Sequence, residues 1–467
     1  MAVLRCTACS ETRKQYPPKY KCEKCEGLLE YSYDFEQLEK GKLLGSPSFW
    51  KYRPFLPQVR SVVSLGEGGT PLHPAKRLAE RLGLHKVYLK DETRNPTNSF
   101  RDRCAALLTS NAVDLNYESV VCASNGNLGA SMAAYCAKSG LVCQVVVPKI
   151  VDMGKLAQML IYDAIIKEHG ETVDESTERA ESLATETDWY QASAELNPLV
   201  IEAQKTISYE VAEQIRAVDW VVVSMGSGGT IYSIWKGFKE LRKLGMVDKL
   251  PRLIGVQAEE CAPIVHAHLE GKSQPVITAK SSTHALAILV KRPMYGKLAL
   301  RALKESKGLT ISVSDQEIFT AEQEIAKLEG LFAEPASSAT IAALKGIVDE
   351  GPISREDEVV CLITGSGLKA TDVLQALTKR RKTAMIGLEL STKEKILHIL
   401  DQKDTYGYAL WKKLGKTITR SAIYQHLDEL SDKGLVVSYE KEGRKYFKIT
   451  NRGKRVLRAI DELKVLL

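Results

Sequence analysis

The stretch that decides the fold is "WVVVSMGSGGTIYSIWKGFKEL", residues 220–241. Its first six residues form an apolar, β-branched run that predicts a buried strand, and residues 231–241 have the pattern of a helix. Between them lies the glycine loop 226–230. Backbone N–H groups in such a loop can surround a phosphate at the positive end of the helix, although a tight turn without a ligand is the alternative. The stretch therefore predicts one strand–loop–helix unit of a parallel α/β sheet.

Similar strand-like runs recur from about residue 46 to residue 380. They are "SVVCAS", "CQVVVP", "LIGVQA" and "EVVCLITG", and helical patterns separate them. Two more polar glycine loops follow such runs, "SNGNLGAS" at 124–131 and "TGSGLK" at 364–369. Loops at the carboxyl ends of parallel strands meet at one edge of an open sheet. We therefore predict a mostly parallel sheet covered by helices on both faces, with one phosphate-bearing ligand where the three loops converge.

The order of motifs in this region resembles that of threonine synthases, which are pyridoxal-phosphate (PLP) enzymes of the tryptophan-synthase-β fold. The resemblance runs from Cys6 to about Lys379 and includes "SLGEGGTPL", "LKDETRNPTNSFRDR", "LNPLVIEAQKT" and "AEPASSATIAAL". It implies an α/β body of PLP fold type II over residues 46–380, with two lobes built on parallel sheets. Carried over by position, the cofactor would contact Asn127 at its ring hydroxyl, Thr364 at its pyridine nitrogen, and Gly226, Ser227, Gly228, Gly229 and Thr230 at its phosphate.

Three departures from the family's motifs fall on the chemistry itself. One is Leu128, where the family often has a small hydroxyl residue or alanine after the asparagine. The family's loop NPTGSFKDR contains the Schiff-base lysine, and Arg101 occupies that position here. A guanidinium with a pKa above about 12 stays protonated, so it acts neither as a nucleophile nor as a base. The family's arginine for the substrate phosphate is replaced by Val200, which removes a charge-assisted bond of about 1.5–3 kcal/mol. The two losses predict a pocket that no longer catalyses, in which Arg101 clamps a carboxylate or a phosphate.

Four of the ten cysteines stand in two pairs, "CTAC" and "CEKC". Cys6, Cys9, Cys22 and Cys25 have the spacing of a closed, all-cysteine zinc site, and a segment with little apolar content needs such a clamp to fold. We therefore predict a zinc-ribbon-like segment over residues 1–45 that holds a structural zinc. Incidental thiols in a flexible arm are the alternative. The other six cysteines stand singly in apolar sequence, which is typical of small buried hydrophobic residues.

All of the net positive charge lies in the C-terminal part of the chain. Residues 391–467 contain 17 Lys and Arg against 10 Asp and Glu, whereas the remaining 48 of each sign cancel. After a linker at 381–390, three helical segments, the two-stranded "LVVSYEKEGRKYFKIT" and a last helix resemble a PadR-like winged helix-turn-helix over residues 391–467. The resemblance assigns base contacts to the third helix and phosphate contacts to the wing. The DNA-binding residues would be Thr419, Arg420, Ser421, Tyr424 and Gln425 in the helix, and Arg444 and Lys445 in the wing.

These features favour a pseudoenzyme that acts as a transcription regulator. The body would bind an amino acid, or PLP joined to an amino acid, and PLP itself would be held without a covalent bond. An active threonine synthase or related carbon–oxygen lyase with an autoregulatory winged helix is the alternative, and it requires a different Schiff-base lysine. A non-catalytic partner subunit is a third hypothesis, and a winged helix used for protein contacts would remove the DNA partner.

Length and composition are those of a cytoplasmic protein. The 467 residues exceed what a single core supports, and 44% hydrophobic with 26% charged residues is ordinary for a globular chain. No apolar run approaches the roughly 18 residues of a membrane helix, and the N-terminus lacks the apolar core of a signal peptide. We therefore expect no membrane partner. Winged-helix regulators commonly bind DNA as dimers, and the resembled enzymes are commonly dimeric, so we expect a homodimer.

Overall fold

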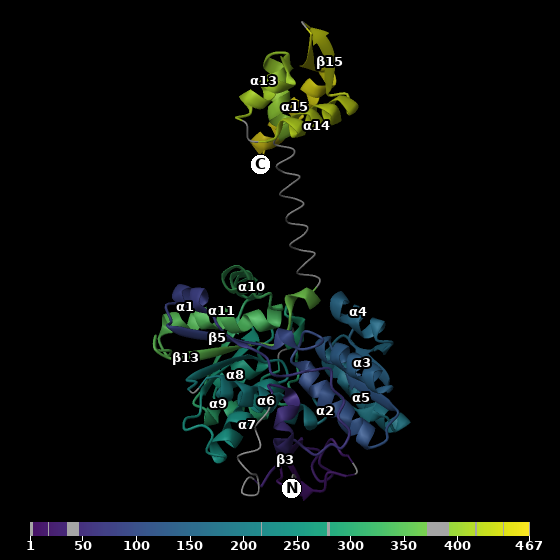
Figure 1. The fold of residues 1–467 in the computed structure, drawn as a ribbon, viewed down its shortest axis with the longest axis vertical. Coiled ribbons are helices and arrows are strands. Elements are labelled where there is room, and N and C mark those ends of the chain that lie inside the picture. Colours follow the sequence, from purple (N-terminus) through teal and green to yellow (C-terminus); the bar gives the residue numbers. More distant parts are fainter. Residues whose placement is uncertain are drawn as a thin grey trace. The chain divides into compact units, whose positions relative to one another are not determined.

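The computed structural model describes residues 3–16, 18–34, 46–215, 217–277, 281–370, 392–415, 418–441 and 443–466. The chain forms two compact units, Met1–Val373 and Leu374–Leu467, each with its own hydrophobic core (Figure 1). The predicted linker at 381–390 lies outside the described residues. Within those ranges, none of the helices combines the length and the apolar character that crossing a bilayer requires.

Two sheets form the body of the first unit, and the predicted parallel strands are confirmed. The larger sheet has the order β12-β11-β10-β13-β5-β4 and the smaller one the order β8-β7-β6-β9. All neighbours in both sheets are parallel except β4 and β5. The strands are β4 Leu72–Pro74, β5 Lys86–Asp91, β6 Ser119–Ala123, β7 Val142–Val147, β8 Ile165–Glu168, β9 Tyr190–Gln191, β10 Trp220–Ser224, β11 Arg252–Ala258, β12 Leu309–Val313 and β13 Glu358–Ile363.

Helices cover both faces of the larger sheet, which is why its central strand β10 is apolar along its whole length (Figure 1). Val222 faces a core shared with α1, α10 and α11, whereas Val221 and Val223 face a core shared with α6 to α9. The helices of this unit are α1 Lys76–Leu82, α2 Arg101–Asp114, α3 Asn127–Ser139, α4 Met153–Ile161, α5 Val173–Thr187, α6 Leu199–Gln214, α7 Gly229–Lys243, α8 Pro263–Leu269, α9 Gly296–Glu305, α10 Asp315–Glu329 and α11 Pro335–Glu350. Short 3-10 helices are η3 Phe49–Phe55, η4 Glu92–Arg94, η5 Leu286–Ile288 and η6 Gly367–Lys369.

The N-terminal cysteine-bearing segment is anchored on the body by buried charges. Its antiparallel strands β1 Val3–Cys6, β2 Thr12–Arg13 and β3 Leu29–Ser32 form a small sheet of order β2-β1-β3. Just after β3, the Tyr33 hydroxyl donates to Glu202 on α6 at 2.5 Å, and Lys236 on α7 lies 2.6 Å from the other oxygen of that carboxylate. Glu202 and Lys236 are buried and Tyr33 is half-buried, so these contacts tie the segment to α6 and α7.

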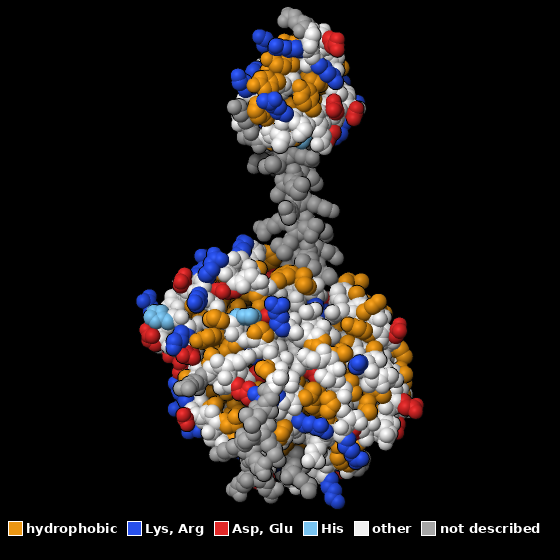
Figure 2. Space-filling model, viewed as in Figure 1, with side chains coloured by type: hydrophobic (Ala, Val, Ile, Leu, Met, Phe, Trp, Pro, Cys, Tyr) orange, Lys and Arg blue, Asp and Glu red, His pale blue; other side chains and the backbone are white. Residues whose placement is uncertain are grey.

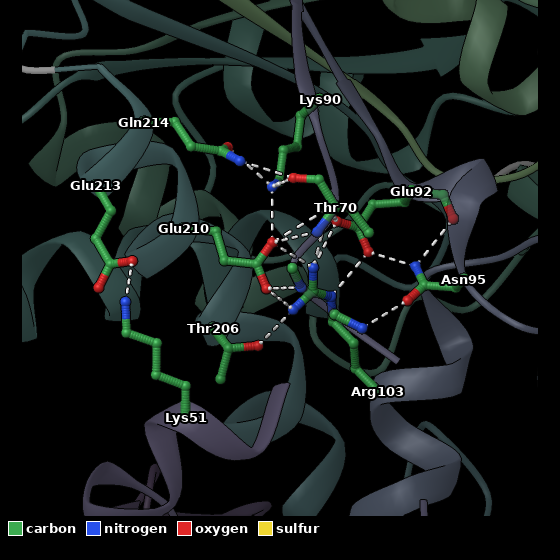
Figure 3. Close-up of polar contacts among 12 residues, drawn as sticks. Lys51, Thr70, Lys90, Glu92, Asn95, Arg103, Thr206, Glu210, Glu213 and Gln214 are labelled. Atoms are coloured by element: carbon green, nitrogen blue, oxygen red, sulfur yellow. Dashed lines mark hydrogen bonds and ion pairs between the residues drawn. The ribbon is translucent and has the colours of Figure 1, made fainter. Parts of the chain in front are cut away.

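A buried network of ion pairs fixes α2 against β5 and α6 (Figure 3). Arg103 on α2 lies 2.8 Å from Glu92 and 2.5 Å from Glu210, and Lys90 lies 2.7 Å from Glu210. Burial alone would raise the pKa of the Glu210 carboxyl, but Arg103 and Lys90 together hold it well below its ordinary value. Two cations thus balance two carboxylates inside the protein. Since Arg103 stands two residues after Arg101, the network also sets the position of the first turn of α2.

The second unit has the order of elements that the winged-helix resemblance predicts. A helix at 392–402 is followed by α13 Gly407–Lys413, α14 Arg420–Asp432, the hairpin β15 Val436–Lys441 and β16 Arg444–Ile449, and α15 Asn451–Leu466. A short strand that the sequence does not reveal, β14 Thr405–Tyr406, pairs with β16. α13 crosses α14 closely, because a Cβ at Gly407 would lie 2.6 Å from the ring of Tyr424.

We expect Arg103→Met to lower the free energy of unfolding by about 3–5 kcal/mol, because the carboxylates of Glu92 and Glu210 would stay buried without their shared cation. Urea denaturation followed by tryptophan fluorescence measures the loss. The matched control is Arg101→Met on the same helix, which should change the free energy by less than about 1 kcal/mol because Arg101 is partly exposed. Equal losses in the two variants would contradict the structural role given to Arg103.

Candidate functional site

A cavity of about 900 Å³, including its open mouth, lies at the carboxyl ends of the parallel strands of the first unit. Residues that follow β6, β10 and β13 line it, so all three predicted glycine loops contribute to one site. The predicted ligand residues that line the cavity are Arg101, Asn127, Val200, Gly226, Ser227, Gly228, Gly229, Thr230 and Thr364. The fold therefore brings all of them together from segments that lie far apart in the chain.

Among the described residues, six helices begin at this cavity. Their first-turn residues in the lining are Arg101 of α2, Asn127 of α3, Val173 of α5, Val200 of α6, Gly229 of α7 and Ala336 of α11. The first N–H groups of a helix have no partner within it and carry partial positive charge. Their convergence adds positive partial charge to the cavity lining, which favours an anionic ligand.

The glycine loop after β10 is tightly constrained at the N-terminus of α7. Gly228 has a φ of +90°, and a Cβ there would lie 3.0 Å from the Cβ of Ala299 and 3.1 Å from the carbonyl oxygen of Tyr295. A side chain is therefore excluded by both backbone strain and space. The neighbouring Ser227 hydroxyl is buried and has no hydrogen-bond partner among the described residues. The loop thus offers a free hydroxyl beside the N-terminus of α7, as a phosphate requires.

Asn127 presents an unused acceptor to the same cavity. Its side-chain amide nitrogen donates to both oxygens of Glu334, at 3.0 and 2.9 Å, whereas its oxygen is buried without a partner in the described part of the chain. Glu334 also pairs with Lys155 at 3.3 Å, and Lys155 pairs with Asp152 at 2.7 Å. Burial lowers the pKa of Lys155, but Glu334 and Asp152 more than offset this and leave it above its ordinary value. Lys155 is therefore a charged, engaged group that orients Asn127 through Glu334.

Arg101 is held at the cavity by the loop that precedes α2. The Phe100 N–H donates to the Thr364 carbonyl at 2.9 Å, and the Ser366 N–H donates to the Asn98 carbonyl at 3.1 Å. Asn98 has a φ of +61°, a left-handed conformation that glycine adopts freely and asparagine tolerates. This conformation accounts for the glycine that the resembled motif has at the same position. The Arg101 guanidinium lies over the ring of Phe100, 4.7 Å from its centre.

No lysine lines the cavity within the part of the chain that the structure describes. Besides Lys155, two other buried lysines of this region have partners of their own. Lys90 donates to Glu210 and to the Thr70 carbonyl, and Lys369 donates to the Thr97 carbonyl at 2.7 Å. Burial lowers the pKa of Lys369 to about 8, but its ammonium does not reach the cavity lining. None of these lysines is placed to substitute for Arg101.

The sequence did not point to several polar residues of the lining. They are Glu195, Gln204, Tyr295 and Glu334. Glu195 lies in the loop before α6, where burial raises the pKa of its carboxyl and Arg101 offsets part of that rise. Its only sequence signal is its place beside the "NP" dipeptide of the Val200 motif, and a single carboxylate carries no pattern of its own.

The four paired cysteines form a separate cluster in the N-terminal segment. The sulfur atoms of Cys6 and Cys25 are 3.5 Å apart and those of Cys9 and Cys22 are 3.7 Å apart. Four thiolates that bind one ion tetrahedrally at about 2.3 Å are separated by a similar distance. A Cβ at Gly27 would lie 2.9 Å from the Cys6 sulfur, so the turn leaves room only for a glycine. The remaining six cysteines are buried and unpaired, as predicted.

The predicted DNA-binding side chains of the second unit are all exposed. They are Thr419, Arg420, Ser421, Tyr424, Gln425, Arg444 and Lys445. The Arg420 guanidinium lies over the rings of Tyr408 and Trp411 on α13, 4.8 and 4.7 Å from their centres. Figure 2 shows Lys and Arg side chains bordering a group of hydrophobic side chains on the face of this unit that is in view.

Comparison with known proteins assigns both parts of the chain. Residues 63–365 match the family model described as pyridoxal-phosphate dependent enzyme, and residues 396–459 match the transcriptional regulator PadR-like family. Threonine synthase of Methanosarcina acetivorans is 40% identical over 374 residues, which cover 78% of this chain and 92% of that protein. Threonine synthase of Methanocaldococcus jannaschii is 38% identical over 403 residues, which cover 84% of this chain and 98% of that protein.

Solved structures show the same fold at low sequence identity. Threonine deaminase isoform 2 of Solanum lycopersicum has a TM-score of 0.55 at 22% identity, and the match covers 65% of this chain and 82% of the deaminase chain. Maize serine racemase has a TM-score of 0.58 at 17% identity, and the match covers 68% of this chain and 93% of the racemase chain.

Proposed function

Because the chain belongs to the pyridoxal-phosphate-dependent enzyme family and is similar to threonine synthases, we propose that it is a pseudoenzyme of that family that regulates transcription. Its body binds an amino acid, either free or joined to PLP, and its PadR-like domain binds DNA in response. One observation carries the proposal: the cavity keeps a phosphate cradle while Arg101 occupies the position of the Schiff-base lysine.

The residues of the cavity fit the non-covalent binding of PLP and do not fit its covalent attachment. The loop 226–230 would hold the phosphate, the free oxygen of Asn127 would accept from the ring hydroxyl, and Thr364 would face the pyridine nitrogen. PLP supplies an electron-withdrawing ring that stabilises negative charge on a bound amino acid. Covalent attachment needs a neutral amine, and the described lining contains none.

The change at Val200 supports the loss of the family's reaction independently of Arg101. Val200 is apolar and buried in the first turn of α6, where the resembled motif has a phosphate-binding arginine. Loss of the general base alone removes roughly 10²-fold or more of a rate. Loss of the phosphate partner weakens substrate binding in addition. A reaction that needs both groups would be very slow here.

The second unit supports the regulatory half of the proposal. Its PadR-like match, its exposed α14 and its basic wing fit a helix that enters the major groove beside a wing that contacts phosphates. The surplus of Lys and Arg in residues 391–467 favours an anionic partner. A homodimer, which two half-sites on DNA would require, is part of the proposal.

An active threonine synthase is the second candidate function. The high coverage of the two threonine synthases favours it, because the chain retains nearly their whole length. It needs a lysine that bonds covalently to PLP in place of Arg101. The two functions therefore differ in one measurable property of the purified wild-type protein.

We expect wild-type protein mixed with PLP to retain no covalent label after borohydride reduction, as measured by intact mass. Arg101→Lys should gain one PLP per chain, because it restores an amine at the start of α2. Threonine formation from O-phosphohomoserine should stay very low in this variant, since Val200 still supplies no charge for the substrate phosphate.

The control for that experiment is Gly228→Ala in the Arg101→Lys background, which should abolish labelling because the new Cβ collides with the cradle's neighbours. Gly330→Ala, at an equally left-handed glycine with open space around it, should leave labelling intact. Covalent PLP on the wild-type protein would contradict the pseudoenzyme and favour the active enzyme.

In a gel-shift assay on the DNA upstream of its own gene, we expect the protein to bind specifically. Arg420→Ala should weaken specific binding by about tenfold or more, as for the loss of a base contact. Lys445→Ala should weaken binding to all DNA sequences equally. It should also reduce, by about one, the slope of the logarithm of the binding constant against the logarithm of the salt concentration. Lys454→Ala on α15, which pairs with Asp401, is the control and should change little. The absence of specific binding, with and without amino acids, would refute the regulatory function.

The cysteine cluster is proposed to hold one structural zinc ion. Elemental analysis of the purified protein should find one zinc per chain, and Cys22→Ser should remove it and lower the thermal midpoint, because the segment depends on the metal for its fold. Cys143→Ser, a buried cysteine outside the cluster, should keep the zinc. Full stability in a metal-free protein would rule out the structural role.

A further inference from the structure

Two side chains of opposite charge line the cavity without an ion-pair partner among the described residues. One is Arg101 at the start of α2, and the other is Glu195 in the loop before α6. Both side chains are half-buried. Charges withdrawn from water in proteins are normally paired, and the buried carboxylate of Glu334 in the same lining follows this rule through Lys155. An unpaired cation and an unpaired anion in one cavity therefore indicate a ligand that carries both charges.

The two groups act on each other electrostatically without forming an ion pair. Burial raises the pKa of the Glu195 carboxyl, and the positive charge of Arg101 offsets part of that rise, so the groups share one region of the cavity. They are nevertheless too far apart to pair directly. Both side chains belong to the lining of the cavity, so a ligand bound there can reach either of them.

The surroundings of this pair add a second acceptor and an apolar wall. The side-chain oxygen of Gln204 on α6 is buried and has no partner in the described residues. Val200 stands one helical turn before Gln204, so both side chains lie on the same face of α6. The apolar side chains of the cavity lining include Val173, Val200, Ile201 and Val290.

We infer that Arg101 and Glu195 form a clamp for a free α-amino acid with an aliphatic side chain. Arg101 binds the carboxylate, Glu195 and the Gln204 oxygen bind the ammonium, and the side chain packs against Val200 and its apolar neighbours. This inference rests on the proposed function, because it names the class of effector for the same cavity. It also gives one reason for two departures: a guanidinium at position 101 anchors the ligand, and a valine at position 200 provides a surface for its side chain.

The clamp requires an amine that is free and protonated, so it excludes an amino acid joined to PLP through its nitrogen. Isothermal titration calorimetry on the full chain, dialysed free of PLP, tests this with three probes of one shape. The first is L-valine. The second is the corresponding 2-hydroxy acid, in which a hydroxyl replaces the ammonium group. The third is L-valinamide, in which a neutral amide replaces the carboxylate. L-valine should bind, and each analogue should bind about tenfold or more weakly, as for the loss of one charge-assisted contact.

Variants assign each charge to its partner. Glu195→Gln should abolish the preference for L-valine over the 2-hydroxy acid and leave the preference over valinamide. Arg101→Gln should have the opposite effect. Arg179→Gln and Glu186→Gln, which break an ion pair on α5 outside the cavity, are the matched controls and should keep both preferences. Because the comparison of analogues on the wild type needs no variant, the inference stays testable even where a substitution disturbs folding.

Each outcome is decisive for the clamp. Equal binding of L-valine and both analogues, or no binding of L-valine, overturns it. If PLP together with an amino acid then alters DNA binding in the gel-shift assay, the proposed function stands without the clamp and the effector is the joined form. If L-valine binds with both preferences and leaves DNA binding unchanged, the clamp stands and the proposed function fails.

Discussion

The ion network around Arg103 is the constraint on which the cavity depends. Arg103 joins Glu92 next to β5 to Glu210 on α6, so the two helices that bear Arg101 and Val200 cannot shift independently. Helix α2 enters the network two residues after its start, and α6 enters it ten residues after Val200. The geometry of this part of the cavity is therefore set by charges that do not belong to its lining. Such an arrangement lets residues of the lining change while the frame stays constant.

Much of the fold was predictable because it depends on patterns. Strands buried on both faces require β-branched runs such as residues 220–223, and phosphate loops require glycines at the ends of those runs. The short strands β4, β9 and β14 were not predictable, because two or three residues carry no period. Nor was the anchoring of the N-terminal segment, since Glu202 and Lys236 look like surface charges until the fold buries them against each other.

The candidate site divides in the same way. Asn127 and the loop 226–230 could be predicted from the glycines and from the order of the motifs, and both line the cavity. Glu195 and Gln204 were missed because their role arises from position alone: each is an isolated polar residue, and the rest of the cavity lining comes from other parts of the chain. Arg101 was found only because the resembled motif has a lysine there. A site marked by a substitution can be detected by comparing sequence motifs. A site formed by residues that are close only in space can be recognised only in the structure.

The unequal attachment of the two terminal parts bears on how such a chain could arise. The second unit has a hydrophobic core formed by its own residues, so a single recombination event could transfer it as one folded module. The N-terminal segment shares its core with the body and covers Glu202, Lys205 and Lys236. Its removal would leave a charged hollow beside α6 and α7. We therefore expect the cysteine-bearing segment to have evolved together with the body, whereas the winged helix is able to evolve separately.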